Sequence, residues 1–257
     1  MDQDLINRRK RALEKIRASE RLKRVSREFL LESSKIDYGY LFNFLGIPII
    51  QQPQDILAIQ EIIWTTKPDL IIETGIAHGG SLICSATMLA VLDMCDAATE
   101  GVVVDPRKPK RKVLGIDIDI RSHNRRLIQE HPLSTRIELI QGSSVSENVI
   151  EQVKHFAAGF ERIMICLDSN HTHKHVLAEL EAYAELTSKG CYCVIFDTNI
   201  AEIPDEFSRD RPWGVDNNPK TAVNAYLESH FGFEVDKDVE DRLLITSSPD
   251  GFLKRIN

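Results

Sequence analysis

The sequence predicts an α/β fold: a Rossmann-like, mostly parallel sheet of seven strands with helices on both faces and an antiparallel C-terminal hairpin. Beyond residue 67, short runs rich in Ile, Leu and Val alternate with longer segments of helical periodicity. This alternation is typical of parallel strands joined by crossover helices. The expected strands are 69–74, 112–118, 136–140, 161–167 and 190–197, and the expected helices are 80–97, 121–131, 145–157 and 173–188.

The C-terminal part departs from this alternation. A helix is expected at 219–230, followed by two apolar runs, 233–236 and 242–246, that are separated by a five-residue polar turn. Two such runs predict a β-hairpin, which gives an antiparallel edge on the sheet. That edge is the architecture of class I methyltransferases, and dinucleotide dehydrogenases normally lack it.

Residues 1–66 are expected to form a helical extension or cap in front of the main domain, 67–257. Helical periodicity covers 1–32, the aromatic segment 37–50 predicts irregular structure, and Pro53 opens a helix over 54–66. Segment 99–111 contains two prolines and several basic residues, which indicates a surface insertion.

Charge is unevenly distributed along the 257 residues, whose net charge is −7. Residues 8–27 carry ten Arg or Lys and two Glu, whereas the chain from residue 28 onward carries 22 basic and 35 acidic residues. An acidic body argues against nucleic acid as the main partner. The basic segment fits a solvated helix docked on the body or on another subunit, and a homo-oligomer is therefore expected. An arm that contacts an anionic polymer or a membrane surface is the second interpretation.

Composition also predicts a cytoplasmic protein without a transmembrane segment. Apolar residues make up 42% of the chain, but no uninterrupted apolar run is long enough to span a bilayer, and the start lacks the apolar stretch of a secretory signal. The cysteines show no zinc-binding spacing and four of them lie in apolar runs, so we expect reduced thiols. They are Cys84, Cys95, Cys166, Cys191 and Cys193.

A glycine-rich turn follows the first strand of the alternating region, with the spacing Glu73-x-Gly75-x-x-x-Gly79. An acid at the end of that strand would repel a pyrophosphate but suits a cationic, amine-bearing ligand such as S-adenosylmethionine. No Gly-Lys-Ser/Thr follows, which excludes a P-loop. Asp117 ends the next strand, where a carboxylate can bind a ribose. An α/β domain with a tight turn and no cofactor is the alternative interpretation.

Further polar residues are expected near the nucleoside. Ser143 or Ser144, after the third strand, could bind an adenine edge, and Ser144 or Ser146 could equally cap the next helix. The full set of expected cofactor-binding residues is Glu73, Thr74, Gly75, Gly79, Ser81, Asp117, Gly142, Ser143, Ser144 and Asp168.

Two aspartates, Asp168 and Asp197, end neighbouring strands. Their carboxylates could converge on a hard divalent cation such as Mg²⁺, and ordinary turn caps are the alternative. His171 lies just beyond the first of them and could serve as a general base, because imidazole titrates near neutral pH. His173 and His175 are expected to be solvated helix positions, and nothing in the sequence completes a zinc site with these histidines.

Several segments of the chain resemble the rhamnosyl O-methyltransferase and cephalosporin hydroxylase family, from about residue 36 to the C-terminus. They are Tyr40–Gln51, Pro68–Gly75, Gly115–Asn124, Leu167–His171, Arg211–Gly214 and Gly251–Lys254. The resemblance implies a class I methyltransferase fold and, by analogy with related macrolide-sugar enzymes, transfer of a methyl group from S-adenosylmethionine to a sugar hydroxyl with Mg²⁺ and a histidine base.

The same resemblance implies roles for individual residues. Glu73, Gly75 and Asp117 would bind the cofactor. Asp168 and Asp197 would bind the metal, and His171 would be the catalytic base. One position departs from the family: several relatives carry Glu-Asp at the end of strand five, whereas this chain has Phe196 before its aspartate. The metal would lose one ligand there unless Thr198, Asn199 or a water replaces it.

The resulting hypothesis is a divalent-metal-assisted O-methyltransferase acting on a sugar, glycan or natural-product hydroxyl. The segments 37–51 and 199–218 are expected to select the acceptor, which the sequence does not name. A hydroxylase would need two histidines and a carboxylate around iron, and no His-x-Asp or His-x-Glu occurs in the chain. A non-catalytic accessory protein of a glycan or natural-product pathway is the remaining alternative.

Overall fold

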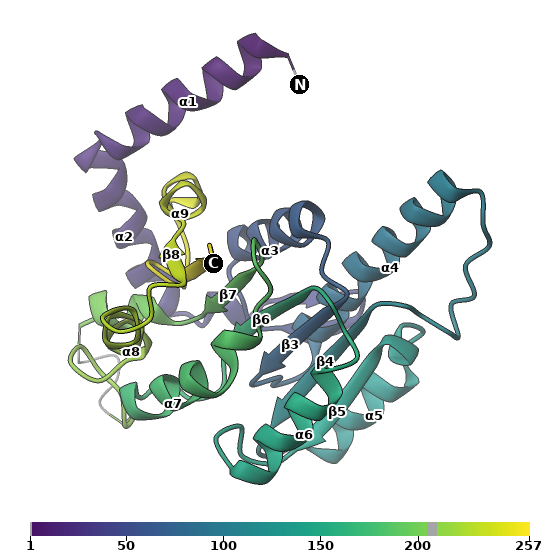
Figure 1. Cartoon of the computed structure of the whole chain (residues 1–257). Coiled ribbons are helices and arrows are strands. Elements are labelled where there is room, and N and C mark those ends of the chain that lie inside the picture. The colour runs from purple at the N-terminus through teal and green to yellow at the C-terminus, as the bar shows by residue number, and fades with distance from the viewer. Residues whose placement is uncertain (1, 205–209) are drawn as a thin grey trace.

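The computed structural model, which describes residues 2–204 and 210–257, confirms the expected seven-stranded sheet (Figure 1). The strand order is β5-β4-β3-β6-β7-β9-β8. The five strands β5, β4, β3, β6 and β7 pair in parallel, and β9 pairs antiparallel with both β7 and β8. The bounds are β3 Leu70–Thr74, β4 Lys112–Asp117, β5 Ile137–Gln141, β6 Ile163–Leu167, β7 Tyr192–Ile195, β8 Phe233–Val235 and β9 Phe252–Arg255.

The chain reverses its direction of travel across the sheet at β3. From β3 it moves outward to β4 and β5, then returns to the other side of β3 to form β6 and β7. Loops leaving the carboxyl ends of β3 and β6 therefore part in opposite directions, which opens a crevice at this edge.

Helices cover both faces of the sheet and create two apolar cores. Along β3, Ile71 contributes to one core while Leu70 and Ile72 contribute to the other, as the two-residue period of a strand requires. The first core receives side chains from α3 (Pro53–Thr66), α4 (Gly80–Glu100) and α5 (Ser122–Glu130). The second receives them from α6 (Glu147–Ala157), α7 (His173–Tyr183) and α8 (Pro219–Leu227).

One helix of the described chain, α4, is long and apolar enough by length and composition to cross a membrane, which the sequence analysis did not anticipate. Half of its most apolar window is buried inside the protein. Leu82, Ile83 and Leu89 pack into the first core. Its hydrophobicity is thus accounted for by the position of α4 against the sheet.

The prediction of a final strand at 242–246 is wrong. Residues Lys237–Leu243 form a helix, α9, and the last strand is β9. The side chain of Asp236 accepts hydrogen bonds from the amides of Asp238 and Val239, and this N-cap starts the helix. Val239 is buried in the first core, so the apolar residues here follow a helical face instead of a strand.

The N-terminal extension also differs from expectation. Two helices, α1 (Gln3–Arg17) and α2 (Glu20–Ser34), replace a single one, because Ser19 caps α2 by accepting a hydrogen bond from the amide of Leu22. α1 reaches away from the body and buries none of its residues (Figure 1).

The aromatic segment expected to be irregular contains a short hairpin, β1 (Phe42–Phe44) and β2 (Ile47–Ile49), after the 3₁₀ turn η1 (Tyr38–Tyr40). Ile47 and Ile49 are buried, and this burial fixes the hairpin against the start of α4.

Candidate active site

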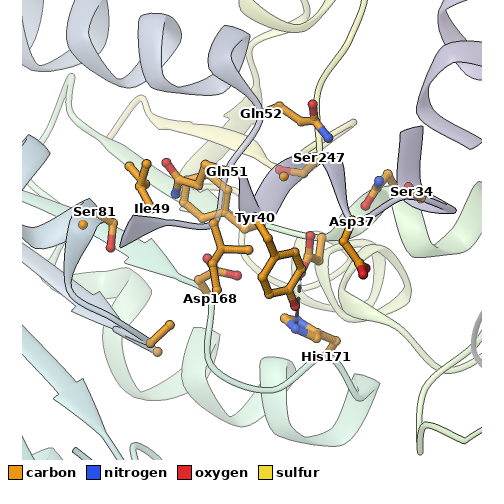
Figure 2. A pocket seen from close by; sticks show the side chains of 18 of the residues that line it. Ser34, Asp37, Tyr40, Ile49, Gln51, Gln52, Ser81, Asp168, His171 and Ser247 are labelled. Atoms are coloured by element: carbon orange, nitrogen blue, oxygen red, sulfur yellow. Dashed lines mark ion pairs between the residues drawn. The ribbon is translucent and has the colours of Figure 1, made fainter. Parts of the chain in front are cut away.

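A cavity of about 520 Å³ lies beyond the carboxyl ends of the parallel strands. Its walls come from the β3–α4 turn, the tip of β4, the loops after β6 and β7, and the segment between α2 and α3 (Figure 2). Six of the residues expected to bind the cofactor, to bind the metal or to act as general base line this cavity. They are Gly75, Ser81, Asp117, Asp168, His171 and Asp197.

Glycines allow the turn after β3 to pack closely against its neighbours. A Cβ on Gly75, whose φ is +79°, would lie 2.0 Å from the carbonyl oxygen of Asp168. A Cβ on Gly80 would lie 2.3 Å from the carbonyl oxygen of Pro48. Gly79 occupies the N-cap position of α4 and is not among the residues that line the cavity. The turn is thus held between the loop after β6 and the β1–β2 hairpin.

Glu73 lies behind the cavity wall instead of in it. Its side chain is buried, and the hydroxyl of Ser81, which does line the cavity, donates a hydrogen bond to it. Burial raises the pKa of Glu73 to about 7, although the bond from Ser81 opposes the shift. Thr74 is also buried and does not line the cavity. Ser81 therefore lies between Glu73 and the cavity, and Thr74 is set back from the cavity wall.

Asp117 reaches the cavity from the tip of β4, as expected. One carboxylate oxygen accepts a hydrogen bond from the amide of Ile76 at 3.0 Å, and the other accepts one from the amide of Asp119 at 3.0 Å. These bonds fix the side chain and brace the β3–α4 turn. Each carboxylate oxygen retains a lone pair that a ribose hydroxyl could use.

The residues after β5 lie outside the cavity lining. Ser144 is buried, its hydroxyl lies 3.1 Å from Nε2 of His175, and its carbonyl accepts a hydrogen bond from the hydroxyl of Tyr183. The backbone of Gly142 is bound to the carbonyl of Asp117 at 2.8 Å. Ser146 occupies the N-cap of α6, but its hydroxyl donates to the carbonyl of Ser143 and makes no capping bond. Ser143 and Ser144 are not among the residues that line the cavity, and the expected adenine contact stays a prediction.

The loops after β6 and β7 bring two aspartates and a histidine together. One potential ligand atom from each of Asp168, His171 and Asp197 lies within 4.8 Å of the other two, and this is the one such group within residues 2–204 and 210–257. Nε2 of His171 is 3.2 Å from Oδ2 of Asp197. Burial, then the charges of Asp197 and Glu73, raise the pKa of Asp168 well above its ordinary value. A divalent cation would neutralise this accumulation of carboxylates.

Phe196, the residue before Asp197, offers no ligand atom to a metal. Its ring is buried in the first core and also lines the cavity. Asn199, from the 3₁₀ turn η4 (Thr198–Glu202), lines the cavity as well and offers an amide oxygen. Among the described residues, the donor set that the structure brings together consists of two carboxylates and an imidazole.

Both segments expected to select the acceptor contribute to the cavity. Asp37, Tyr40 and Gln51 approach from the N-terminal side (Figure 2). From the other segment, Trp213 meets the ring of His171 edge-on, with 4.7 Å between ring centroids, and the guanidinium of Arg211 lies 5.4 Å from the Trp213 ring. Residues 205–209 of the expected loop 199–218 lie outside the described residues.

Comparison with known proteins decides the family. The model of the family described as rhamnosyl O-methyltransferase/CmcI matches residues 36–256. The chain belongs to this family. It is 29% identical over 231 residues to a rhamnosyl O-methyltransferase of Mycobacterium tuberculosis, covering 87% of this chain and 84% of the relative. A rhamnosyl O-methyltransferase of Mycobacterium leprae is 27% identical over 217 residues, covering 82% of each chain.

Solved structures agree on the fold. A CmcI structure described as containing Mg and SAM superposes with a TM-score of 0.55 and 17% identity, over 85% of this chain and 78% of that one. CalS11, described as a TDP-rhamnose 3'-O-methyltransferase, gives a TM-score of 0.50 and 15% identity, over 99% and 96%. These likenesses establish the shared architecture.

A buried polar network behind the site was missed in the sequence. His175, expected to be solvated, is half-buried, and its Nε2 lies 3.1 Å from the hydroxyls of both Ser144 and Ser169. Ser169 also donates to Oε1 of Glu179, which is completely buried. The i, i+4 spacing of His175 and Glu179 on one helix face was the available signal. Through Ser169 the pair holds the loop that carries Asp168 and His171.

The buried position of Glu73 predicts a pH effect on stability. Its folded pKa is about 7 against an ordinary 4.5, so the unfolded chain releases this proton first as the pH rises. Glu73 therefore destabilises the fold progressively between about pH 4.5 and pH 7, by roughly 3 kcal/mol at the upper limit. We expect Glu73→Gln to remove this fall in the free energy of unfolding.

Urea unfolding of the ligand-free protein at pH 5 and pH 7 measures the free energy of unfolding. If the variant and the wild type lose the same stability between these pH values, the prediction is wrong.

Proposed function

We propose that this protein transfers the methyl group of S-adenosylmethionine to a hydroxyl of a sugar, with a bound divalent cation and His171 as general base. The observation that carries the proposal is the cluster of Asp168, His171 and Asp197 facing the same cavity as the glycine turn and Asp117. The names of the curated relatives, rhamnosyl O-methyltransferases, support the sugar acceptor.

The walls of the cavity fit the methyl donor. Gly75 and Ser81 present a tight turn at the start of α4, and Asp117 offers carboxylate oxygens on the adjoining strand tip. Asp168, directly after β6, adds a carboxyl group beside this turn, and a nearby cation would favour its charged form. A ligand with a sulfonium and an ammonium group is favoured in such a setting. S-adenosylmethionine, when bound, supplies the electrophilic methyl carbon.

The donor set also fits a hard cation. Asp168 and Asp197 would hold Mg²⁺ through carboxylate oxygens, the ligand type that this ion prefers. When bound, the cation would lower the pKa of an acceptor hydroxyl and orient it. The structures described as containing Mg and SAM, or Mg and SAH, belong to relatives of low identity and are consistent with this assignment.

His171 is the group of the cluster suited to accept a proton. Its imidazole lines the cavity and is held between Asp197 and the edge of Trp213. The carboxylate of Asp197 stabilises the imidazolium that forms when the acceptor hydroxyl loses its proton. Much of the remaining acceleration would come from holding oxygen, carbon and sulfur in line.

Iron-dependent hydroxylation is the reaction that the cluster disfavours. A non-haem iron site uses two histidines and one carboxylate on one face, whereas the metal-compatible group within the described residues has one histidine and two carboxylates.

The base assignment makes a direct prediction. His171→Ala should lower the turnover number by about 100-fold or more, since general-base catalysis contributes on that scale, while affinity for S-adenosylmethionine stays within about twofold. Transfer of radiolabelled methyl to rhamnosides and calorimetry with the donor measure the two quantities. His173→Ala is the matched control, because that side chain bonds to Thr221 on α8 and not to the site. Wild-type turnover in His171→Ala would remove the base from the mechanism.

The metal assignment makes a second prediction. EDTA should abolish methyl transfer and added Mg²⁺ should restore it, and Asp197→Asn should raise the Mg²⁺ concentration that gives half-maximal rate by about tenfold or more. The reason is the loss of one of the two anionic ligands found within residues 2–204 and 210–257. A Mg²⁺ titration of the initial rate provides the measurement. Full activity in EDTA would show that the cluster works without a cation.

The network behind the site makes a third prediction. His175→Ala should reduce the turnover number by about tenfold and leave donor affinity unchanged, because the loop carrying Asp168 and His171 loses an anchor and small displacements of reacting groups are costly. His175→Asn, which keeps a polar side chain, should recover part of the rate. If His175→Ala lowers the melting temperature but not the turnover of the folded enzyme, the network is purely structural.

A further inference from the structure

The turn between β3 and α4 contains a residue in a backbone conformation that L-amino acids rarely adopt. Ala77 has a φ of +44°, in the left-handed region, although it carries a Cβ. Ala77 also lines the active-site cavity, as does the next residue, His78. Such conformations persist where the surrounding structure holds them, and they are concentrated at functional sites. A contact that holds Ala77 therefore shapes the cavity wall.

Asn124, on α5, supplies this contact. Its side chain is only 3% exposed, and its Nδ2 donates a hydrogen bond of 2.8 Å to the carbonyl of Ala77. This bond fixes the orientation of the amide, so that its Oδ1 can only accept. Oδ1 lies 3.4 Å from Nδ1 of His78, and Nδ1 is therefore the nitrogen that carries a proton and donates. One buried side chain thus holds two consecutive residues of the turn.

The same face of α5 contacts the turn at a second point. Ile128 lies one helical turn after Asn124, and a Cβ on Gly79 would lie 2.5 Å from its side chain. Gly79 is thus needed for close packing against α5. Asp117 and Asn124 both belong to the segment Gly115–Asn124, which carries part of the family resemblance. The proposed function draws on Asp117 alone from this segment.

We propose that Asn124 is a positioning residue for the methyl donor, which keeps Ala77 in the left-handed conformation that gives the β3–α4 turn its donor-binding shape. This rests on the proposed function, which places the donor against that turn. Without the bond from Asn124, Ala77 would relax to an ordinary conformation, which an L-residue favours by roughly tenfold. Donor binding would then have to restore the turn, and the apparent affinity would fall by the same factor.

Calorimetric titration of S-adenosylhomocysteine into the full chain tests the proposal. Asn124→Ala should raise the dissociation constant about tenfold. Asn124→Asp keeps the size of the side chain but cannot donate to the carbonyl of Ala77, so it should raise the dissociation constant at least as much. The KM for S-adenosylmethionine should rise in parallel, whereas the turnover number at saturating donor should change by less than about threefold.

A second substitution isolates the backbone conformation as the cause. Glycine adopts positive φ about as readily as negative φ. In an Ala77→Gly background, Asn124→Ala should therefore weaken the binding of S-adenosylhomocysteine by less than about threefold, against about tenfold in the otherwise wild-type chain. An equal cost in both backgrounds would overturn the proposal, because Asn124 would then act independently of the conformation of Ala77.

Asn218→Ala is the matched control. Asn218 is also completely buried, and its Nδ2 donates to the carbonyls of Gly214 at 2.9 Å and Val215 at 2.6 Å. It braces a different segment, so its loss should leave the affinity for S-adenosylhomocysteine within about twofold. An equal loss of affinity in Asn218→Ala would show that general destabilisation weakens donor binding, and would overturn the proposal. Circular dichroism confirms that each variant is folded.

Methyl transfer measured on the same samples separates this inference from the proposed function. Wild-type donor affinity in both Asn124 variants would overturn the role of Asn124 and leave the proposed function intact. Donor binding that depends on Asn124, without methyl transfer to a rhamnoside, would support the role of Asn124 and contradict the sugar acceptor. No binding of S-adenosylhomocysteine to the wild-type chain would contradict the donor site and, with it, both proposals.

Discussion

The close approach of the β3–α4 turn to the loop after β6 is the constraint on which the site depends. Gly75 leaves no room for a Cβ against the backbone of Asp168, and the amide of Asp168 bonds to the carbonyl of Thr74 at 2.8 Å. This contact joins the two halves of the sheet where the strand order reverses. It sets the glycine turn and the loop that carries Asp168 and His171 side by side, so the separation of these two segments is fixed by backbone contacts.

The second constraint is electrostatic. Glu73 and Asp55 are buried and Asp168, near both of them, is half-buried; desolvation raises the pKa of each, to about 6 for Asp55. Hydrogen bonds from Ser81 to Glu73, and from the amide and hydroxyl of Ser247 to Asp55, reduce the cost of burying these carboxyl groups. Asp168 and Asp197 lack such extensive compensation and face the cavity. The arrangement therefore disfavours the charged carboxylates, and a bound cation, whether a metal or a sulfonium, would stabilise them.

The sequence predicted the sheet and the strand-tip residues well, because buried parallel strands and their terminal acids leave local patterns of period and composition. It failed where a side-chain cap decided the local conformation. Asp236 started a helix in place of the strand expected at 242–246, and Ser19 divided the first helix. It also failed for His175, whose burial depends on Ser144, a residue from another loop. The spacing of His175 and Glu179 pointed to a pair on one helix face, but the contact with Ser144 joins distant segments and has no signature in local periodicity.

The shape of the sheet also bears on how the protein behaves in concentrated solution. One outer strand, β8, has only three residues, Phe233–Val235, and the β9 residues beside it are already paired on both sides. The other outer strand, β5, exposes Glu138 and Gln141, while Leu139 and Ile140 are half-buried. The short length of β8 and the exposed charge of Glu138 on β5 leave neither edge with a long, flat apolar surface. Such a surface is what allows a strand of another molecule to pair with an edge. The fold is thereby protected against edge-to-edge aggregation.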